Sequence, residues 1–327
     1  NDTGRVLGHC AFFSRPVSPG VLGVGDDAAR LGLPPDTDLV SCKDLLIEGR
    51  HFFADVAPVT LGHKALAVNL SDLAAMGAKP LACLLGIGLT TPDPDWLRDF
   101  ADGFYRLADQ WQCPLIGGDT ISSEFGTVIS VTALGTLPKG EPGLRRDRGQ
   151  IDDDLWISGD LGGADVALRA LQGDDNISPE LLAATRERLE RPEPRVALGQ
   201  ALLPHAHAAI DISDGLAQDL QHLLKASHCG AEIQWQQLPV HPMLQALPEN
   251  IKRLAVLNGG DAYELCFTAP KRSRTNIEQL AIALSVPLSR VGSLTQAPGL
   301  RLHHGNGLVE SLSAQGFDHF KRGEQHG

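Results

Sequence analysis

Hydrophobic and polar residues along the first part of the chain follow a mixture of helix-like and strand-like periods. The clearest helix-like run opens at Pro58 and Thr60 and ends at Gly77, and glycine at this place is typical of a helix C-cap. The apolar run at 81–89 that follows predicts a buried strand. The other elements expected in this part are short strands and turns within 20–53, a helix at about 95–111, a turn at Gly117-Gly118-Asp119 and a strand at 127–137.

A polar stretch at 138–154, which carries prolines, glycines and no hydrophobic period, is the best candidate for a linker. Strand-like and helix-like runs alternate again after it. This mixture predicts an α/β or α+β protein of two domains, at 1–140 and 150–327. The strands expected after the linker are at 155–159, 208–213, 231–235, 264–270, near 291–294 and near 300–304, and the helices are at 160–171, 214–226 and about 275–285, with a helical pair broken at 191–195.

The composition narrows the classes of partner. The chain has 327 residues, 43% of them hydrophobic and 21% charged, which suits an ordinary globular protein of two domains. The longest apolar stretch is too short to span a bilayer, and the N-terminus has no signal-peptide pattern, so we expect no membrane. The net charge of −12 argues against nucleic acid as the main partner. The six cysteines show no CxxC spacing, and we expect them to be reduced in a cytoplasmic protein.

Several aspartates lie in or beside runs of apolar and glycine residues. A carboxylate in such a place has to be neutralised, paired or bound to metal, because burying an isolated charge is costly. No matching set of lysines and arginines lies among them. They therefore predict a set of oxygen ligands for Mg²⁺, and with it a site that handles polyphosphate. The six are Asp27, Asp44, Asp72, Asp119, Asp211 and Asp214.

The residues alone leave other interpretations of these positions open. The segment 23–28 resembles the GxGxxA dinucleotide fingerprint, but its two acids would repel phosphate, and a plain Asp-rich turn is the alternative. Asp72 lies inside the predicted helix, where it is a ligand if it faces a cleft and a surface charge if it faces solvent. Asp211 and Ser213 lie on one side of an extended chain, and N-capping by Ser213 or Asp214 is the alternative role.

Phosphate-binding signals other than the aspartates are weak. No Walker A sequence is present, so a phosphate would be held by metals and scattered amides rather than by one P-loop. Arg145, Arg146 and Arg148 form a basic group in an acidic protein; one of them contacts phosphate, or all are solvated in the linker. The His-Ala-His segment at 205–207 has no further ligands at zinc-binding spacing.

Seven segments of the chain stand out in order: GVGDDAA, DLLIEGRHF, HKALAVNLSDLAAMGAKP, LIGGDT, DISDGL, GGDAYELCF and GFDHF. Taken together, they resemble the thiamine-monophosphate kinase family, which belongs to an ATP-binding superfamily with aminoimidazole ribonucleotide synthetase. The resemblance spans nearly the whole chain. It implies a synthetase-like architecture of mixed sheets flanked by helices, and homodimers of two-domain subunits. The N-terminal domain then binds ATP and Mg²⁺ and pairs with its copy, and the C-terminal α/β domain completes the active-site cleft.

The activity implied by the resemblance is transfer of the γ-phosphoryl group of ATP to thiamine phosphate, with several Mg²⁺ ions, giving thiamine diphosphate. No catalytic side chain is implied beyond metal-assisted transfer, because the acceptor phosphate is already ionised. The resemblance also assigns individual residues. The metal ligands are Asp27, Lys43, Asp44, Asp72, Asp119, Asp211 and Asp214; the ATP contacts are Gly118, Asp119, Arg146 and Ser213, with Arg145 as the alternative arginine; the substrate contacts are His51, Asp261 and Phe317.

The chain departs from the family pattern at two sites that bear on function. Lys43 precedes Asp44 where the family usually has an oxygen ligand. Lys43 either supplies part of one metal's charge, or its side chain points away and leaves the backbone carbonyl as the ligand. The family's Gly-Gly-Glu-Asp-Tyr-Glu-Leu has Asp261 and Ala262 at the first two of its three acidic positions here. Two alternatives therefore accompany the kinase. One is a related superfamily enzyme with another acceptor, and the other is a degenerate protein that binds nucleotide or thiamine phosphate without turnover.

Overall fold

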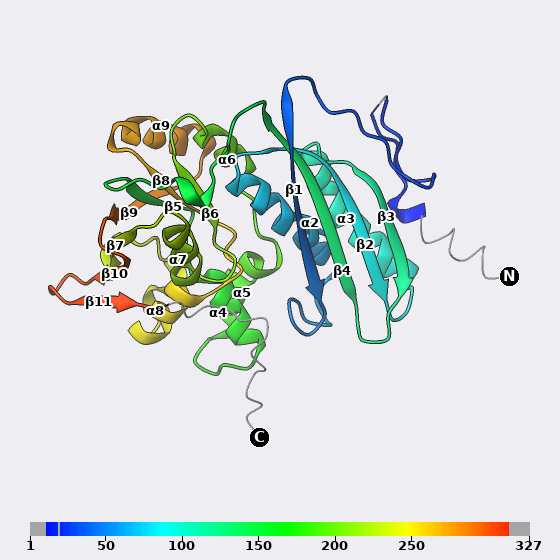
Figure 1. The fold of residues 1–327 in the computed structure, drawn as a ribbon. Coiled ribbons are helices and arrows are strands. Elements are labelled where there is room, and N and C mark those ends of the chain that lie inside the picture. Colours follow the sequence, from blue (N-terminus) through cyan, green and yellow to red (C-terminus); the bar gives the residue numbers. More distant parts are fainter. Residues whose placement is uncertain (1–10, 19, 314–327) are drawn as a thin grey trace. The chain divides into compact units, whose positions relative to one another are not determined.

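The computed structural model describes residues 11–18 and 20–313, which form two compact units (Figure 1). Unit 1 comprises the chain up to Gly143 together with Glu190–Gln200, and unit 2 comprises Leu144–Leu189 and the chain from Ala201 onward. The chain therefore enters unit 2 within the polar stretch at 138–154, returns to unit 1 for a short segment and leaves it again. The return is held by a close approach within unit 1, where a Cβ on Gly199 would lie 2.0 Å from the carbonyl oxygen of Ala74.

Unit 1 is built on a four-stranded sheet in the order β1-β4-β2-β3, in which only β2 and β3 run parallel. Helix α2 packs against β1, β2 and β4 on one face, and α3 packs against α2 (Figure 1). The elements of unit 1 are η1 (Ala11–Phe13), β1 (Thr37–Ile47), α2 (Pro58–Ala75), β2 (Lys79–Leu89), α3 (Pro94–Gln110), β3 (Leu115–Ser122) and β4 (Val128–Pro138).

The two helices of unit 1 form as the sequence predicts. Gly77 follows α2 with a φ of 74°, a conformation that costs glycine little, and its N–H bonds to the carbonyl of Ala74 at 2.9 Å. The helices then pack very closely, because a Cβ on Gly103 of α3 would lie only 1.8 Å from the carbonyl oxygen of Val59. This close packing fixes α2 against the sheet, with Phe100 and Phe104 fully buried beside it.

Unit 2 is built on a seven-stranded mixed sheet in the order β11-β10-β7-β9-β5-β8-β6. Its main core lies between this sheet and α7, with residues such as Ile210, Leu220 and Leu257 buried. The strands are β5 (Asp154–Ser158), β6 (Ala208–Asp211), β7 (Gly230–Gln234), β8 (Leu265–Ala269), β9 (Leu288–Thr295), β10 (Gly299–His303) and β11 (Val309–Leu312). The helices are α4 (Gly163–Leu171), α5 (Pro179–Glu190), α7 (Leu216–Ala226), α8 (Glu249–Asn258) and α9 (Arg274–Leu284), with short 3₁₀ turns η2 (Arg146–Arg148), η3 (Trp235–Gln237), η4 (Pro242–Ala246) and η5 (Lys271–Ser273). Helix α6 (Val196–Leu202) lies mostly in the segment that returns to unit 1.

The α/β class with mixed sheets flanked by helices is confirmed. One local expectation is wrong. The Gly117-Gly118-Asp119 segment was expected to be a turn, but it lies inside β3, because it pairs in register with β2. Helix α8 is not among the helices predicted from the sequence. In the part of the chain that the structure describes, no helix is long and apolar enough to cross a membrane.

Candidate active site

Two predicted metal ligands of unit 1, Asp44 and Asp72, lie close to one thiol. Asp44 is on β1 and Asp72 is on α2, which packs against that strand. Burial raises the pKa of the Cys42 thiol far above its ordinary value, and the negative charges of Asp72 and Asp44 raise it further. Both carboxylates are half-buried, so Asp72 is neither a core residue nor an ordinary surface charge. The helix and the strand thus bring two oxygen donors of the kind that Mg²⁺ prefers toward one place.

The backbone of Asp44 is held by the fully buried side chain of Asn69 on α2. Its Oδ1 accepts a hydrogen bond from the main-chain N–H of Asp44 at 3.1 Å, and its Nδ2 donates to the carbonyl of Ala65 at 3.2 Å. Because β1 is an edge strand, an N–H on its outer edge has no neighbouring strand to pair with. The side-chain oxygen of Asn69 supplies the acceptor that a neighbouring strand would otherwise provide, and it fixes Asp44 relative to α2.

Lys43 points away from this pair of carboxylates. Successive side chains of a strand alternate between the two faces, and the even-numbered residues of the central part of β1 are more buried than the odd-numbered ones. The exposed ammonium of Lys43 donates to the hydroxyl of Ser130 at 2.5 Å and to that of Thr132 at 3.5 Å, both on β4. The side chain of Lys43 therefore points away from the proposed metal ligands and does not replace part of a metal's charge. A metal contact through the backbone carbonyl of Lys43 stays a prediction.

Gly118 and Asp119 lie in β3 beside a small pocket. A Cβ on Gly118 would lie 1.8 Å from the carbonyl oxygen of Leu85, so no side chain fits there. The exposed Asp119 lies in one cross-strand row with Gly86, Ser130 and Leu45. Because Leu45 and Asp44 are consecutive in β1, the side chain of Asp119 projects from the face of the sheet opposite to that of Asp44. The pocket has a volume of about 100 Å³ and is lined by Phe13, Val24, Leu85, Leu115, Gly117, Gly118, Asp119 and Thr120.

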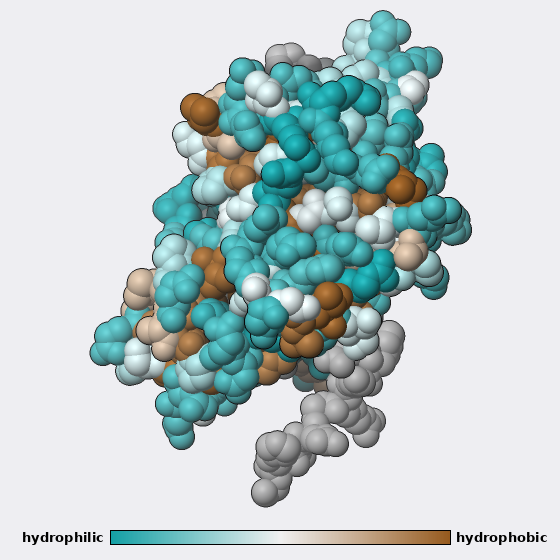
Figure 2. All heavy atoms as spheres, turned by 90° about the vertical axis from the view of Figure 1, so that its left-hand side faces the viewer, coloured by the Kyte–Doolittle hydropathy of each residue, from teal (hydrophilic) through white to brown (hydrophobic). Residues whose placement is uncertain are grey.

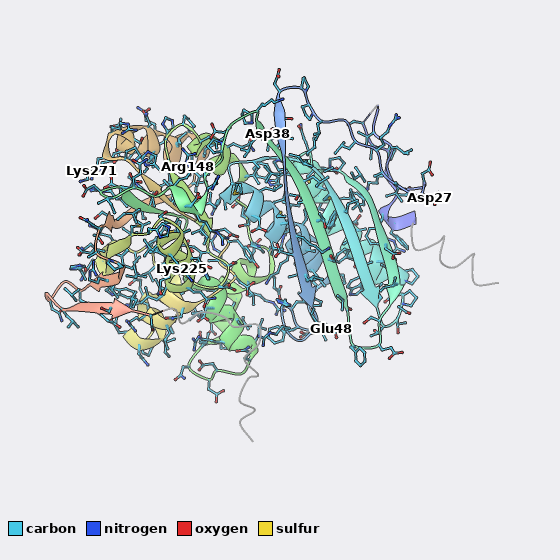
Figure 3. The ribbon with its side chains drawn as sticks, viewed as in Figure 1. Asp27, Asp38, Glu48, Arg148, Lys225 and Lys271 are labelled. Carbon is cyan, nitrogen blue, oxygen red and sulfur yellow. The ribbon has the colours of Figure 1, made fainter. Side chains whose placement is uncertain are left out.

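Asp27 lies in a turn next to the same pocket. The backbones of Leu22 and Arg30 pair by two hydrogen bonds of 2.9 Å and close the turn, with Val24 lining the pocket. Asp27 is exposed, and its main-chain N–H bonds to the carboxylate of Asp26 at 2.8 Å (Figure 3). The turn is thus formed as an Asp-rich turn, and no long helix follows it as a dinucleotide fingerprint would require.

His51 has one ring nitrogen committed to the backbone. Its Nδ1 lies 3.1 Å from the N–H of Ile47, which can only donate, so Nδ1 is the acceptor. In the neutral imidazole the proton then lies on Nε2. The half-buried ring therefore has its Nε2–H as a hydrogen-bond donor, which suits an anionic group such as phosphate.

In unit 2, the predicted residues 211–215 form the loop between β6 and α7. Asp211 is buried, whereas Ser213 and Asp214 are half-buried. The alternative role of Ser213 or Asp214, N-capping of the helix, is not found, because the N-cap of α7 is Gly215 and no side chain caps it. The amides of residues 213–215 bond instead to the carboxylate of Asp219, in the first turn of the helix. Burial raises the pKa of Asp219 to about 7; its bonds to the loop amides oppose this, and the charges of Asp211 and Asp214 add to it. Two further carboxylates thus meet in this loop.

Asp261 lies in a second loop that is bonded to the first. The N–H of Asp261 donates to the carbonyl of Ser213, and that of Tyr263 donates to the carbonyl of Ile212, both at 2.8 Å. Asp261 and Tyr263 have φ angles of 58° and 49°, which are uncommon for residues with side chains. Strained backbone of this kind clusters at functional sites. The structure therefore brings Asp261 together with the 211–215 loop.

The structure distinguishes the two arginines considered for ATP. Arg145 donates from Nε to Asp147 at 2.9 Å and from Nη2 to the second oxygen of the same carboxylate, and this pairing lowers the pKa of Asp147. Arg146 is exposed, and none of the described carboxylates forms an ion pair with it. Arg146 therefore keeps a guanidinium that can bind phosphate through two parallel hydrogen bonds.

The donor set fits Mg²⁺ without forming a complete site. Within the described ranges, no three His, Cys, Asp or Glu side chains are gathered in a metal-binding arrangement. Each unit instead offers a pair of carboxylates, Asp44 with Asp72 and Asp211 with Asp214, and carboxylate oxygens supplemented by water or phosphate are typical Mg²⁺ ligands. Phe317 lies outside the described residues.

Comparisons with known proteins place the chain in a family. The AIR synthase related protein N-terminal domain matches residues 25–137, and the C-terminal domain of the same proteins matches residues 152–305. The thiamine-monophosphate kinase of Escherichia coli strain K12 is 39% identical over 305 residues, which cover 91% of this chain and 92% of the relative. The chain belongs to the thiamine-monophosphate kinase family.

Solved structures of the family have the same fold. The thiamine-monophosphate kinase of Stenotrophomonas maltophilia K279a is 42% identical with a TM-score of 0.81, and the match covers 92% of this chain and 95% of that one. AaThiL complexed with AMPPCP and TMP is 27% identical with a TM-score of 0.76, and the match covers 88% and 89% of the two chains. The chain therefore spans nearly the whole length of these family members.

Two residues that organise the site were not predicted as part of it. Asn69 was visible only as a polar residue three positions before Asp72 on the same helix face. Asp219 carried a fainter signal, as an acid in the first turn of the predicted helix after the Asp-Ile-Ser-Asp-Gly segment. An acid there is also what an ordinary helix start prefers, so the sequence alone could not separate the two roles.

Proposed function

We propose that the chain transfers the γ-phosphoryl group of ATP to the phosphate of thiamine phosphate, giving thiamine diphosphate and ADP. The observation that carries this proposal is the pair of carboxylates in each unit, on a chain that matches thiamine-monophosphate kinases over about nine-tenths of its length. A solved relative holds AMPPCP and TMP, which supports ATP as the phosphoryl donor.

The reaction brings two polyanions together and needs no strong general base, because the acceptor phosphate is already ionised. Bound Mg²⁺ would neutralise phosphate charge and orient the reacting groups. We propose Asp44 and Asp72, and Asp211 and Asp214, as holders of these ions, with Asp27, Asp119 and the carbonyl of Lys43 as further ligands. On this proposal, Arg146 and Ser213 bind ATP phosphates.

The remaining contacts divide between the nucleotide and the thiamine moiety. The pocket beside β3 has apolar walls from Phe13, Val24 and Leu115 and a polar side at Gly118 and Asp119, which suits the flat base of a nucleotide. The Nε2–H of His51 would donate to the phosphate of thiamine phosphate. The carboxylate of Asp261 would attract the positive thiazolium ring, and Phe317 would contact the same substrate.

A homodimer is part of the proposal, with unit 1 of each copy pairing through its sheet. The face opposite α2 carries exposed hydrophobic side chains, with Leu39 at 51%, Leu45 at 52% and Ile121 at 59% exposure. An exposed apolar sheet face of this kind usually marks a protein interface. The described part of the face seen in Figure 2, by contrast, is largely hydrophilic, with hydrophobic side chains in small separate groups.

The test is a direct assay of the purified protein with ATP, Mg²⁺ and thiamine phosphate. We expect ADP and thiamine diphosphate to appear in equal amounts, as measured by a coupled ADP assay and by chromatography of the thiamine esters. Removal of Mg²⁺ with a chelator should abolish both products. Nucleotide binding without either product would support the degenerate protein instead. ADP formed only with a different phosphate acceptor would support the related enzyme.

A further inference from the structure

One carboxylate oxygen of unit 2 accepts hydrogen bonds from three consecutive amides. Oδ2 of Asp219 lies 3.0 Å from the N–H nitrogen of Ser213, 2.9 Å from that of Asp214 and 3.1 Å from that of Gly215. Asp219 is only 4% exposed and belongs to the first turn of α7. Gly215, the N-cap of α7, supplies no capping side chain of its own. The three amides that lead into the helix are thus satisfied by a carboxylate from inside it.

This bonding fixes the backbone of the residues that carry the proposed ligands. An ordinary N-cap side chain accepts from one or two amides of the helix that follows it. Asp219 instead accepts from Ser213 and Asp214, which precede the helix, so it determines how the loop approaches α7. The backbone of Asp214 is fixed by the bond from its amide to Asp219 and by the next residue, Gly215, which is the N-cap of α7. The direction in which the Asp214 side chain leaves the loop follows from this backbone position.

The same loop also sets the position of the second loop. Ser213 and Ile212 accept hydrogen bonds from Asp261 and Tyr263. The two backbones touch, because a Cβ on Gly260 would lie 2.6 Å from the carbonyl oxygen of Ser213. A shift of the first loop would therefore displace Asp261 as well.

Helix stability alone does not account for a charged residue at this position. Asp219 is buried near Asp211 and Asp214, and like charges at short range repel one another. A neutral serine, threonine or asparagine at the N-cap would satisfy the first amides of α7 without adding that repulsion. What such a residue would not do is bind Ser213 and Asp214 from the helix side.

We propose that Asp219 is a positioning residue for phosphoryl transfer, which holds the 211–215 loop and, through it, the 259–263 loop in one arrangement. The proposal rests on the proposed function, since it assigns Asp211 and Asp214 to Mg²⁺ and Asp261 to thiamine phosphate. On this proposal, Asp219 itself contacts neither Mg²⁺ nor thiamine phosphate. Its carboxylate acts through the backbone.

The test compares Asp219→Ala and Asp219→Asn with Asp153→Asn as the matched control. Asp153 is an equally buried carboxylate of unit 2, at 3% exposure, that accepts from Gln150 and pairs with His207, away from both loops. Three quantities are measured: the Mg²⁺ concentration at half-maximal binding of a nonhydrolysable ATP analogue by calorimetry, the KM for thiamine phosphate, and kcat. Thermal unfolding of each variant reports its stability.

Asp219→Ala removes the acceptor, whereas asparagine keeps a neutral oxygen in the same place. We expect the alanine variant to raise the Mg²⁺ midpoint and the KM for thiamine phosphate by at least about tenfold and to lower kcat by about a hundredfold. The asparagine variant should stay within about fivefold of the wild type, because its amide oxygen still accepts from the loop. The control should change each quantity by less than about threefold even if its stability falls.

Two results would overturn the proposal. If the asparagine and alanine variants lose Mg²⁺-dependent binding equally, Asp219 acts through its charge and not by position. If Asp153→Asn causes the same losses, the effect is general destabilisation. Should the alanine variant not fold, hydrogen exchange of Asp219→Ser decides instead, because the shorter serine side chain cannot accept from all three amides. Faster exchange in 211–215 and in 259–263 supports positioning, and unchanged exchange contradicts it. The binding measurements can be made even if the wild type makes no ADP. A failure of the proposed function can therefore be distinguished from a failure of the positioning role of Asp219.

Discussion

Asn69 joins helix α2 to Asp44 through a single 3.1 Å hydrogen bond from the main-chain N–H of Asp44 to the Asn69 side-chain oxygen. The Asn69 side chain is fully buried, so its removal leaves an N–H and a small cavity with no compensation. We expect Asn69→Ala to lower the free energy of unfolding by about 1–3 kcal/mol. We also expect the Mg²⁺ concentration for half-maximal ADP formation to rise about tenfold, because Asp44 is no longer held near Asp72. Denaturant unfolding and a Mg²⁺ titration measure the two effects.

Thr185→Val is the matched control for Asn69→Ala. Thr185 is also fully buried and bonds to the carbonyl of Leu181 within a helix of unit 2, far from any proposed ligand in sequence. The control should lose stability while its Mg²⁺ requirement stays within about twofold of the wild type. An unchanged Mg²⁺ requirement in Asn69→Ala would mean that Asp44 needs no support from α2.

Lys43 tests the idea that the site is degenerate. Its side chain bonds to Ser130 and Thr132 on the sheet face opposite to Asp44. Lys43→Thr should therefore change kcat and the Mg²⁺ requirement by less than about threefold, because the substitution removes no charge from the carboxylate side of the strand. The measurement is steady-state kinetics at several Mg²⁺ concentrations. A large gain in kcat would show that the lysine had impaired the metal site.

The placement of Lys43 illustrates what the sequence can and cannot predict. Period and glycine signals were enough for α2 and its end at Gly77, and for the two-domain α/β class. The aspartates could be singled out because each lies in an apolar context. The face from which a side chain leaves β1, however, depends on the register with β4, and register follows from packing of the whole sheet. Asp219 was missed for a similar reason, since its partners are backbone amides that the sequence does not identify.

Arg146 and Arg145 are neighbours with different surroundings. The guanidinium of Arg145 is paired with Asp147, whereas no described carboxylate forms an ion pair with Arg146. Arg146→Ala should raise the KM for ATP by about tenfold with little change in the KM for thiamine phosphate, because a charge-assisted contact to phosphate is lost. Arg145→Ala should leave both values within about threefold. The opposite order would assign the ATP contact to Arg145.

Two substitutions separate the roles of the two ring nitrogens of His51. Asparagine can still accept from the N–H of Ile47 as Nδ1 does, but it has no donor at the position of Nε2. His51→Asn should therefore keep the stability within about 0.5 kcal/mol and raise the KM for thiamine phosphate about tenfold. Glutamine reaches further and places its amide near Nε2, so His51→Gln should retain more substrate affinity and lose more stability. Equal KM values for the two variants would contradict a contact through Nε2.

The sheet face of unit 1 predicts the assembly of the protein. Leu45 lies on the exposed face of β1 at 52% exposure, in one cross-strand row with Ser130 of β4. A glutamate at this position would place a charge in a surface that loses its water on pairing, and burying an unpaired charge is costly. We expect Leu45→Glu to convert a dimer into a monomer in sedimentation equilibrium at micromolar concentration. Leu308→Glu, at 57% exposure in unit 2, should leave the dimer intact. A wild type that sediments as a monomer, or a Leu45→Glu variant that remains dimeric, would place the contact elsewhere.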